Sequence, residues 1–315
     1  MRLGDNRLGR LARRALQRAP LVGDILTRGM IDTPASHGVE ANARVYDAYA
    51  DQARALGLDD IRLFLSFDCD TDRDPKAALE VMTLLDALGI KATFAVPGAA
   101  LRRSAEIYRR LMDRGAEFMN HGDRPHAAWQ DDRFVSVTFY ESMSFEEVEA
   151  DIRKGHETMH EVLGIRPLGF RAPHFGHFQE PDQLGLVHRV ARDLGYRYCS
   201  TTLPSYGLAH GPAHDTGGIV ELPTFGTIRS PVSLLDSWSH LSDRRDYALS
   251  DMYETLLIET VDAFSRLELP ALLTWYVDPA HVAGQAAFER SMQELARRRV
   301  PSLGAMEAAS LLRTA

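Results

Sequence analysis

The sequence contains only two cysteines, Cys69 and Cys199, which lie far apart in its 315 residues. Neither belongs to a Cys-x-x-Cys pair, so the pattern excludes a disulfide scaffold and a cysteine-ligated zinc site. Any metal site must therefore use histidine and carboxylate side chains. Long hydrophobic runs are also absent, because no stretch approaches the roughly 18 to 20 apolar residues of a membrane-spanning helix.

The start of the chain has no apolar run of the roughly 7 to 15 residues that a secretory signal requires, so we expect a cytoplasmic protein. The formal net charge of −8 weighs against a nucleic-acid-binding protein. Residues 1–30, however, hold seven arginines against two aspartates. Leucines and alanines recur with helical spacing from Leu8 to Ala19, which predicts a short basic amphipathic helix. It could contact an anionic membrane surface weakly, at the inner face of the membrane, or form a terminal arm docked on its own domain.

Hydrophobic residues make up 45% and charged residues 25% of the chain, which is typical of a globular protein. From Ile61 onward, short apolar runs alternate with longer amphipathic stretches. The runs predict strands near residues 62–67, 92–96, 117–119, 168–171, 196–200, 219–222 and 272–277. Helical patterns lie at about 75–88, 100–113, 145–163, 181–194, 249–266 and 284–298. This alternation predicts an α/β fold with a parallel sheet, closed or nearly closed into a barrel over residues 59–315, after a helical extension and linker at 1–58.

Two acidic residues follow the first predicted strand, where the catalytic residues of a barrel are expected. Asp68 and Asp70 are two positions apart, so on an extended chain they point to the same side. Two carboxylates in one place repel each other unless a cation or a shared proton neutralises them. The alternative is an aspartate-rich turn that caps the following helix through Asp72 or Asp74.

The third predicted strand is followed by His121 and His126, with Gly122 and Pro125 between them. A loop rather than a helix must carry these histidines, and it could fold both imidazoles onto one ion. Taken alone, a pair of histidines in a loop is more often part of the polar surface than a metal site. With Asp70 it forms a set of two histidines and one carboxylate, which leaves metal positions open for water and substrate.

Five short motifs together resemble a known family. They are Asp-x-Asp after the first strand, Lys91–Gly98 on the second, His-Gly…His after the third, Arg171-Ala172-Pro173 after the fourth, and Leu194-Gly195-Tyr196 before the fifth. In this order they resemble the polysaccharide deacetylase, or NodB-homology, family of carbohydrate esterases. The resemblance covers about residues 60–310.

The resemblance implies a distorted (β/α) barrel of seven or eight strands that removes an acetyl group from an N-acetylated sugar with the help of a metal. Asp68 then corresponds to the catalytic base and Arg171 to the residue that positions it. Asp70, His121 and His126 correspond to the metal ligands. The expected ion is divalent, zinc first, with cobalt, nickel or iron as alternatives; it would activate a water and polarise the amide carbonyl.

The sequence departs from the family pattern at two of these sites. The family's histidines are usually four apart, whereas His121 and His126 are five apart, so the loop must bulge by one residue for His126 to ligate. The family's general acid is usually a histidine before a late proline, and here Asp278 precedes Pro279. Because an aspartate near a cation is normally ionised, either the pKa of Asp278 is raised, or His281 or His174 donates the proton.

A literal H-E-x-x-H motif, the zinc-protease signature, begins at His156. Its helical wheel places His156 at the flank and His160 towards solvent, so we predict a covering helix of the barrel instead. Two other functions stay open: a cyclic-amide (allantoin-like) hydrolase of the same fold, and a non-catalytic sugar-binding relative. For a cytoplasmic deacetylase, we expect a lipid- or nucleotide-linked N-acetyl sugar of surface-polysaccharide or glycoconjugate biosynthesis as substrate.

Overall fold

The computed structural model describes residues 42–313. The predicted amphipathic helix within residues 1–30 lies outside this range, and so does the linker that follows it. None of the helices described between residues 42 and 313 is long and apolar enough to cross a bilayer.

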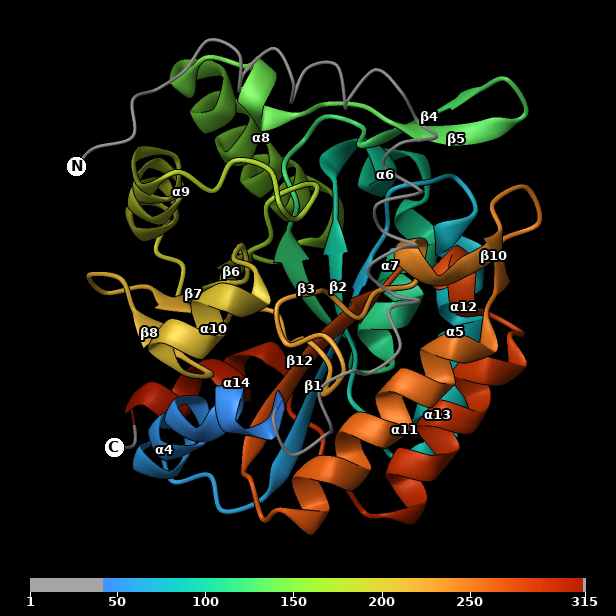
Figure 1. The fold of residues 1–315 in the computed structure, drawn as a ribbon. Helices are drawn as coiled ribbons and strands as arrows, with labels where there is room; N and C mark the ends of the chain where they lie inside the picture. The colour runs from blue at the N-terminus through green and yellow to red at the C-terminus, as the bar shows by residue number, and fades with distance from the viewer. Residues whose placement is uncertain (1–41, 314–315) are drawn as a thin grey trace, which may run out of the picture.

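The core of the fold is one curled sheet of eight strands (Figure 1). In spatial order the strands are β12 (Ala271–Val277), β1 (Ile61–Asp68), β2 (Thr93–Val96), β3 (Glu117–Asn120), β6 (Gly169–Phe170), β7 (Tyr198–Cys199), β9 (Val220–Glu221) and β8 (His214–Asp215). All neighbouring pairs are parallel except β8 with β9. Every strand predicted from the sequence is present. The sheet is open between β12 and β8, so the predicted distorted barrel is confirmed in the form of a half-barrel.

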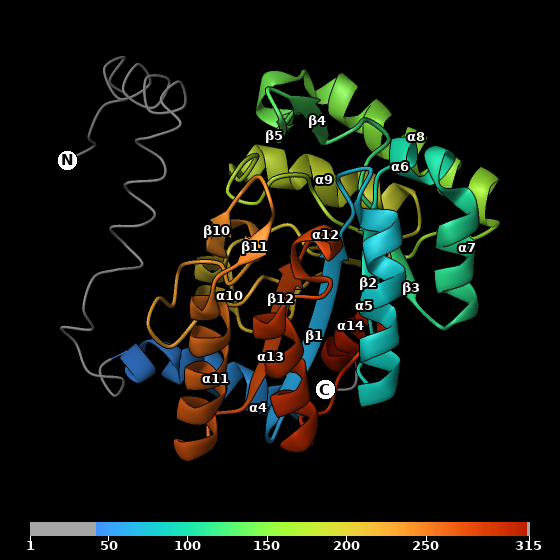
Figure 2. The ribbon, with the colours of Figure 1, turned by 90° about the vertical axis from the view of Figure 1, so that its right-hand side faces the viewer.

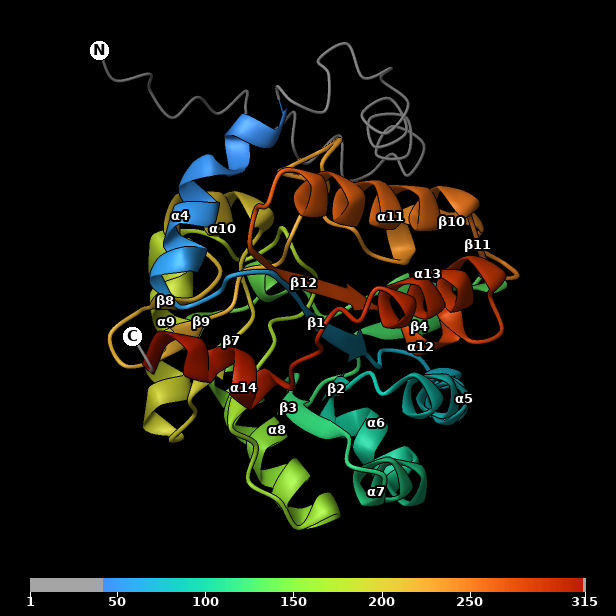
Figure 3. The ribbon, with the colours of Figure 1, turned by 90° about the horizontal axis from the view of Figure 1, so that it is seen from below.

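Helices surround the sheet (Figure 3). They are α4 (Asp47–Ala55), α5 (Asp74–Leu88), α6 (Gly98–Arg103), α7 (Ala105–Asp113), α8 (Phe145–Leu163), α9 (Pro181–Asp193), α10 (Pro204–His210), α11 (Asp251–Arg266), α12 (Pro279–Val282), α13 (Ala286–Arg297) and α14 (Ala305–Ser310). The helix predicted at 100–113 is divided at Ser104, whose φ of −133° is not helical. The others agree with prediction to within a few residues, and α8 begins with the expected capping box of Ser144 and Glu147.

The main hydrophobic core lies between the sheet and these helices. Phe64 and Phe67 of β1 are fully buried, as expected for a central parallel strand covered on both faces. Helix α4 joins the same core, since Tyr49 is buried and its hydroxyl donates a hydrogen bond to the Leu272 carbonyl oxygen of β12 at 3.0 Å. The division of the chain at residue 58 stays a prediction.

Two β-hairpins that the sequence did not predict lie at the end of the sheet towards which β1 and β12 point (Figure 2). The first pairs β4 (Ala127–Gln130) with β5 (Arg133–Ser136), and the second pairs β10 (Leu241–Asp243) with β11 (Ala248–Leu249). Asp131 and Asp132 form the two-residue turn of the first hairpin with φ values of 48° and 58°. Positive φ at both positions is the geometry that tight hairpins favour.

Candidate functional site

The residues singled out from the sequence meet at the carboxyl edge of the sheet. Asp68 ends β1, His121 directly follows β3, Arg171 directly follows β6 and Asp278 directly follows β12. Because parallel strands run in the same direction, these ends meet at one edge, where α/β proteins bind their ligands.

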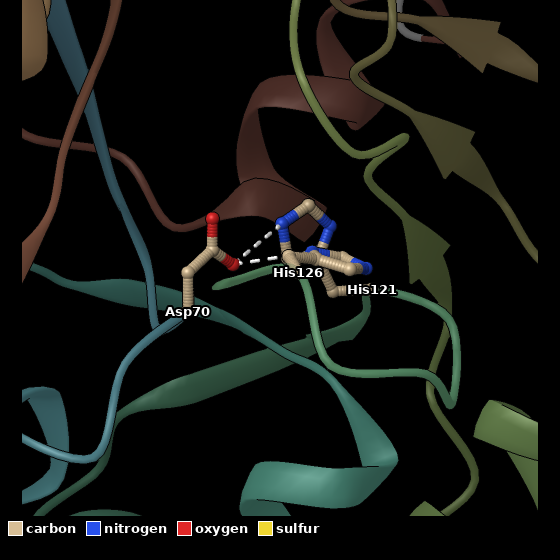
Figure 4. Close-up of side chains that lie close together, drawn as sticks. All are labelled: Asp70, His121 and His126. Carbon is tan, nitrogen blue, oxygen red and sulfur yellow. Dashed lines mark hydrogen bonds and ion pairs between the residues drawn. The ribbon is translucent and has the colours of Figure 1, made fainter. Parts of the chain in front are cut away.

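Asp70, His121 and His126 place three ligand atoms within 4.8 Å of one another (Figure 4). The Asp70 carboxylate lies 3.5 Å from His121 Nε2 and 3.1 Å from His126 Nδ1. The His121–His126 loop turns at Gly122, whose φ is +78°, and the amides of Asp123 and Arg124 donate hydrogen bonds to the Asp151 carboxylate. This turn accommodates the five-residue spacing and brings His126 to Asp70.

The three side chains fit a divalent ion. Ligands bound at about 2.0–2.2 Å in a tetrahedral arrangement lie about 3.4 Å apart, close to the two separations from Asp70. His121 Nδ1 donates a hydrogen bond to the Arg171 carbonyl oxygen at 2.7 Å, which turns the lone pair of Nε2 towards Asp70. His121 Nε2 is buried and has no hydrogen-bond partner among residues 42–313.

The electrostatics of His126 and Asp70 agree with metal binding. Burial, followed by the charge of His121, lowers the pKa of His126 to about 4. Burial alone would raise the pKa of Asp70, but His126 and His121 hold it well below its ordinary value. A neutral imidazole and an ionised carboxylate are the forms that coordinate a metal.

Asp68 and Arg171 form a buried pair beside this cluster. The Arg171 guanidinium donates hydrogen bonds to Asp68 Oδ1 and to Ser66 Oγ, both at 2.8 Å, so it fixes the direction of the carboxylate. Burial raises the pKa of Asp68 to about 6, against the opposing charges of Arg171 and His121. His121 Nε2 lies 3.8 Å from the other oxygen of Asp68, so base and ligands share one site.

Asp278 and His281 face this site from β12 and α12. His281 Nδ1 lies 3.1 Å from Asp278 Oδ2 and 3.0 Å from Ser237 Oγ. Its Nε2 is buried without a hydrogen-bond partner in the described part of the chain. Burial alone would lower the pKa of His281, but the Asp278 charge raises it overall. His174, the third candidate for the acid, instead has its Nε2 2.7 Å from the Val137 carbonyl oxygen.

A cavity of about 310 Å³ joins the two sides of the site. Its lining includes Asp68, Asp70, His126, Asp278 and His281. It also includes residues that sequence reasoning missed, namely Val135, Ser136, Leu234 and Asp236. No strand-end motif indicates the last two, because they belong to an irregular segment between β9 and β10.

The H-E-x-x-H motif lies on α8, and neither histidine lines the cavity. His156 Nδ1 instead lies 3.1 Å from the Tyr196 hydroxyl. The helix therefore covers the sheet, as predicted.

A second potential metal cluster consists of His188, Cys199 and Glu221. Its carboxylate is already hydrogen-bonded, because Glu221 accepts bonds from the amides and hydroxyls of Thr201 and Thr202, and His188 Nε2 lies 2.9 Å away. We interpret this cluster as the structural anchor of the loop after β7.

The polysaccharide deacetylase family model matches residues 57–199. No curated protein matches the sequence. Among solved structures, a Mycobacterium smegmatis protein classed as a polysaccharide deacetylase is 19% identical with a TM-score of 0.62, over 82% of this chain and 91% of that one. A CE4 family pseudoenzyme from Bacillus anthracis is 12% identical with a TM-score of 0.50, over 79% and 66% of the two chains. A mutant of that pseudoenzyme with restored activity is 13% identical with a TM-score of 0.51, over 79% and 68%.

Proposed function

Because residues 57–199 place this chain in the polysaccharide deacetylase family, we propose that it is a metal-dependent hydrolase that removes the acetyl group of an N-acetylated sugar. The observation that carries the proposal is the arrangement of three metal-type ligands, a buried carboxylate and a buried imidazole around one cavity.

Asp68 acts as the general base. A divalent ion held by Asp70, His121 and His126 would supply Lewis acidity and a water of lowered pKa. Asp68 accepts the proton of the attacking water, and Arg171 keeps the carboxylate ionised and correctly directed through its 2.8 Å hydrogen bond.

His281 acts as the general acid in place of the histidine that the family usually has at position 278. His281 lines the cavity, and its Nε2, which has no hydrogen-bond partner among the described residues, can donate a proton to the leaving amine, while Asp278 and Ser237 orient the ring through Nδ1. Asp278 thus serves as a partner of the acid, much as a carboxylate orients the histidine of a catalytic triad.

The substrate is expected to be a lipid- or nucleotide-linked N-acetyl sugar, handled in the cytoplasm, as argued from the sequence. Membrane contact through residues 1–30 and the choice of zinc stay predictions of the same kind. A non-catalytic sugar-binding protein is the second candidate, because Asp278 replaces the usual acid.

The test measures acetate release from N-acetylglucosamine and its oligomers by protein stripped of metal and then reloaded with zinc, cobalt, nickel or iron. We expect activity only in the reloaded protein, and a loss of about 10²-fold or more in Asp68→Asn with metal content unchanged. Glu157→Gln, in the H-E-x-x-H motif, is the matched control and should keep full activity. Sugar binding without acetate release in every form would favour the non-catalytic candidate.

A further inference from the structure

The cavity is small and has a closed wall on one side. Its volume of about 310 Å³ is at the lower end of the 300–1,000 Å³ that is typical of small-molecule sites, with room for about one acetamido sugar.

The β4–β5 hairpin forms the first part of the wall. It begins directly after His126, and its Ala127, Val135 and Ser136 line the cavity. The Val137 amide donates to the His126 carbonyl oxygen at 2.7 Å, and His174 Nε2 lies 2.7 Å from the Val137 carbonyl oxygen. The hairpin is therefore anchored at His126, one of the three proposed metal ligands.

Tyr247, in the loop between β10 and β11, joins the second hairpin to the first. Its ring is stacked with that of Phe134 at a centroid distance of 6.4 Å and lies 4.6 Å from the ring of His281, which lines the cavity. The Arg73 guanidinium lies 5.0 Å from the Tyr247 ring and 6.0 Å from the Phe134 ring. Such cation–π contacts join the two hairpins, so the wall is continuous from His126 to His281.

Another part of the lining lacks such a connection. Within the described residues, no hydrogen bond, ion pair or ring contact joins the 174–177 loop to the 232–239 segment, although both line the cavity. On this side a longer substrate can leave the cavity without breaking a contact between described residues.

We infer that, given the deacetylase function proposed above, the enzyme acts on a single N-acetyl sugar or on the terminal sugar of a longer molecule, and not on internal residues of a polymer. An internal residue needs two exits for its neighbours, and the two joined hairpins, held together by Phe134, Tyr247 and Arg73, close one of them.

The experiment incubates the metal-loaded enzyme with N-acetylglucosamine oligomers of increasing length and locates each lost acetyl group by mass spectrometry. We expect one acetyl group lost per chain, at a terminus, at a rate per chain that does not rise with length. Repeated loss at internal residues would overturn the inference while supporting the proposed function. No acetate from any length, monomer included, would overturn the proposed function and with it the inference.

The wall itself is tested with Phe134→Ala and with the double variant Phe134→Ala/Tyr247→Ala. We expect both to release internal acetyl groups, at least 10-fold faster than the parent protein. The matched control is Tyr206→Ala, a ring that contacts His210 and His214 and belongs to neither hairpin. If these variants still remove only terminal acetyl groups, the wall does not set this specificity.

Discussion

Glu221→Gln is expected to destabilise the fold strongly, because the Glu221 carboxylate is fully buried and accepts hydrogen bonds from both Thr201 and Thr202. His188 Nε2 lies 2.9 Å from the same carboxylate. A glutamine of the same size turns an N–H group towards donors and removes the charge. Each buried donor left without an acceptor costs about 1–3 kcal/mol, and we expect the free energy of unfolding to fall by at least that amount.

The assay is urea unfolding followed by circular dichroism, with the midpoint and slope compared between parent and variant. Glu149→Gln is the matched control: Glu149 is paired with Arg153 and Arg189 at the surface, so its loss should change stability by less than about 1 kcal/mol. A loss below about 1 kcal/mol in Glu221→Gln as well would refute the anchoring role.

The pH dependence gives a second test of the same carboxylate. Burial alone would raise the pKa of Glu221, but the hydrogen bond and charge of His188 and the amide of Thr201 lower it overall. Its ionised form therefore stabilises the fold fully above the unfolded-state pKa of about 4.3, and this contribution is lost as the pH falls towards the lower folded-state pKa. The stability difference between parent and Glu221→Gln should shrink in acid. A difference that stays constant from neutral pH into that range would contradict this assignment.

Two further substitutions test the site. His281→Gln should lower kcat by about 10²-fold or more with metal content unchanged, whereas an unchanged kcat would remove His281 as the acid. Gly122→Ala should destabilise the protein by about 1–3 kcal/mol and weaken metal binding, because the residue has a φ of +78° and a new Cβ would lie 2.4 Å from Asp151 Oδ2. A Gly122→Ala variant with parental stability would show that the loop can turn without glycine.

The strands and the site residues that follow them could be predicted because apolar runs are local and parallel strand ends meet at one edge. Asp68, Asp70, His121 and Arg171 were found in this way. The walls of the cavity could not be predicted in this way. The β4–β5 hairpin lacks a glycine-containing turn, and Asp236 lies in a segment whose path depends on long-range packing.

The distinction between the candidate proton donors also required the structure. Asp278 and His281 are three residues apart, and nothing in their spacing tells which one faces the cavity with a free donor. Only the contact of His281 Nδ1 with Asp278, together with the unpartnered Nε2, separates their roles.

The central claim is that Asp70, His121 and His126 hold one divalent ion, and metal content measured by elemental analysis tests it most directly. The parent protein would be compared with Asp70→Ala, with Cys199→Ala from the second cluster and with His156→Ala from the H-E-x-x-H motif. We predict one ion per chain in the parent and in both control variants, and none in Asp70→Ala. An ion retained in Asp70→Ala, or lost in either control, would contradict the account.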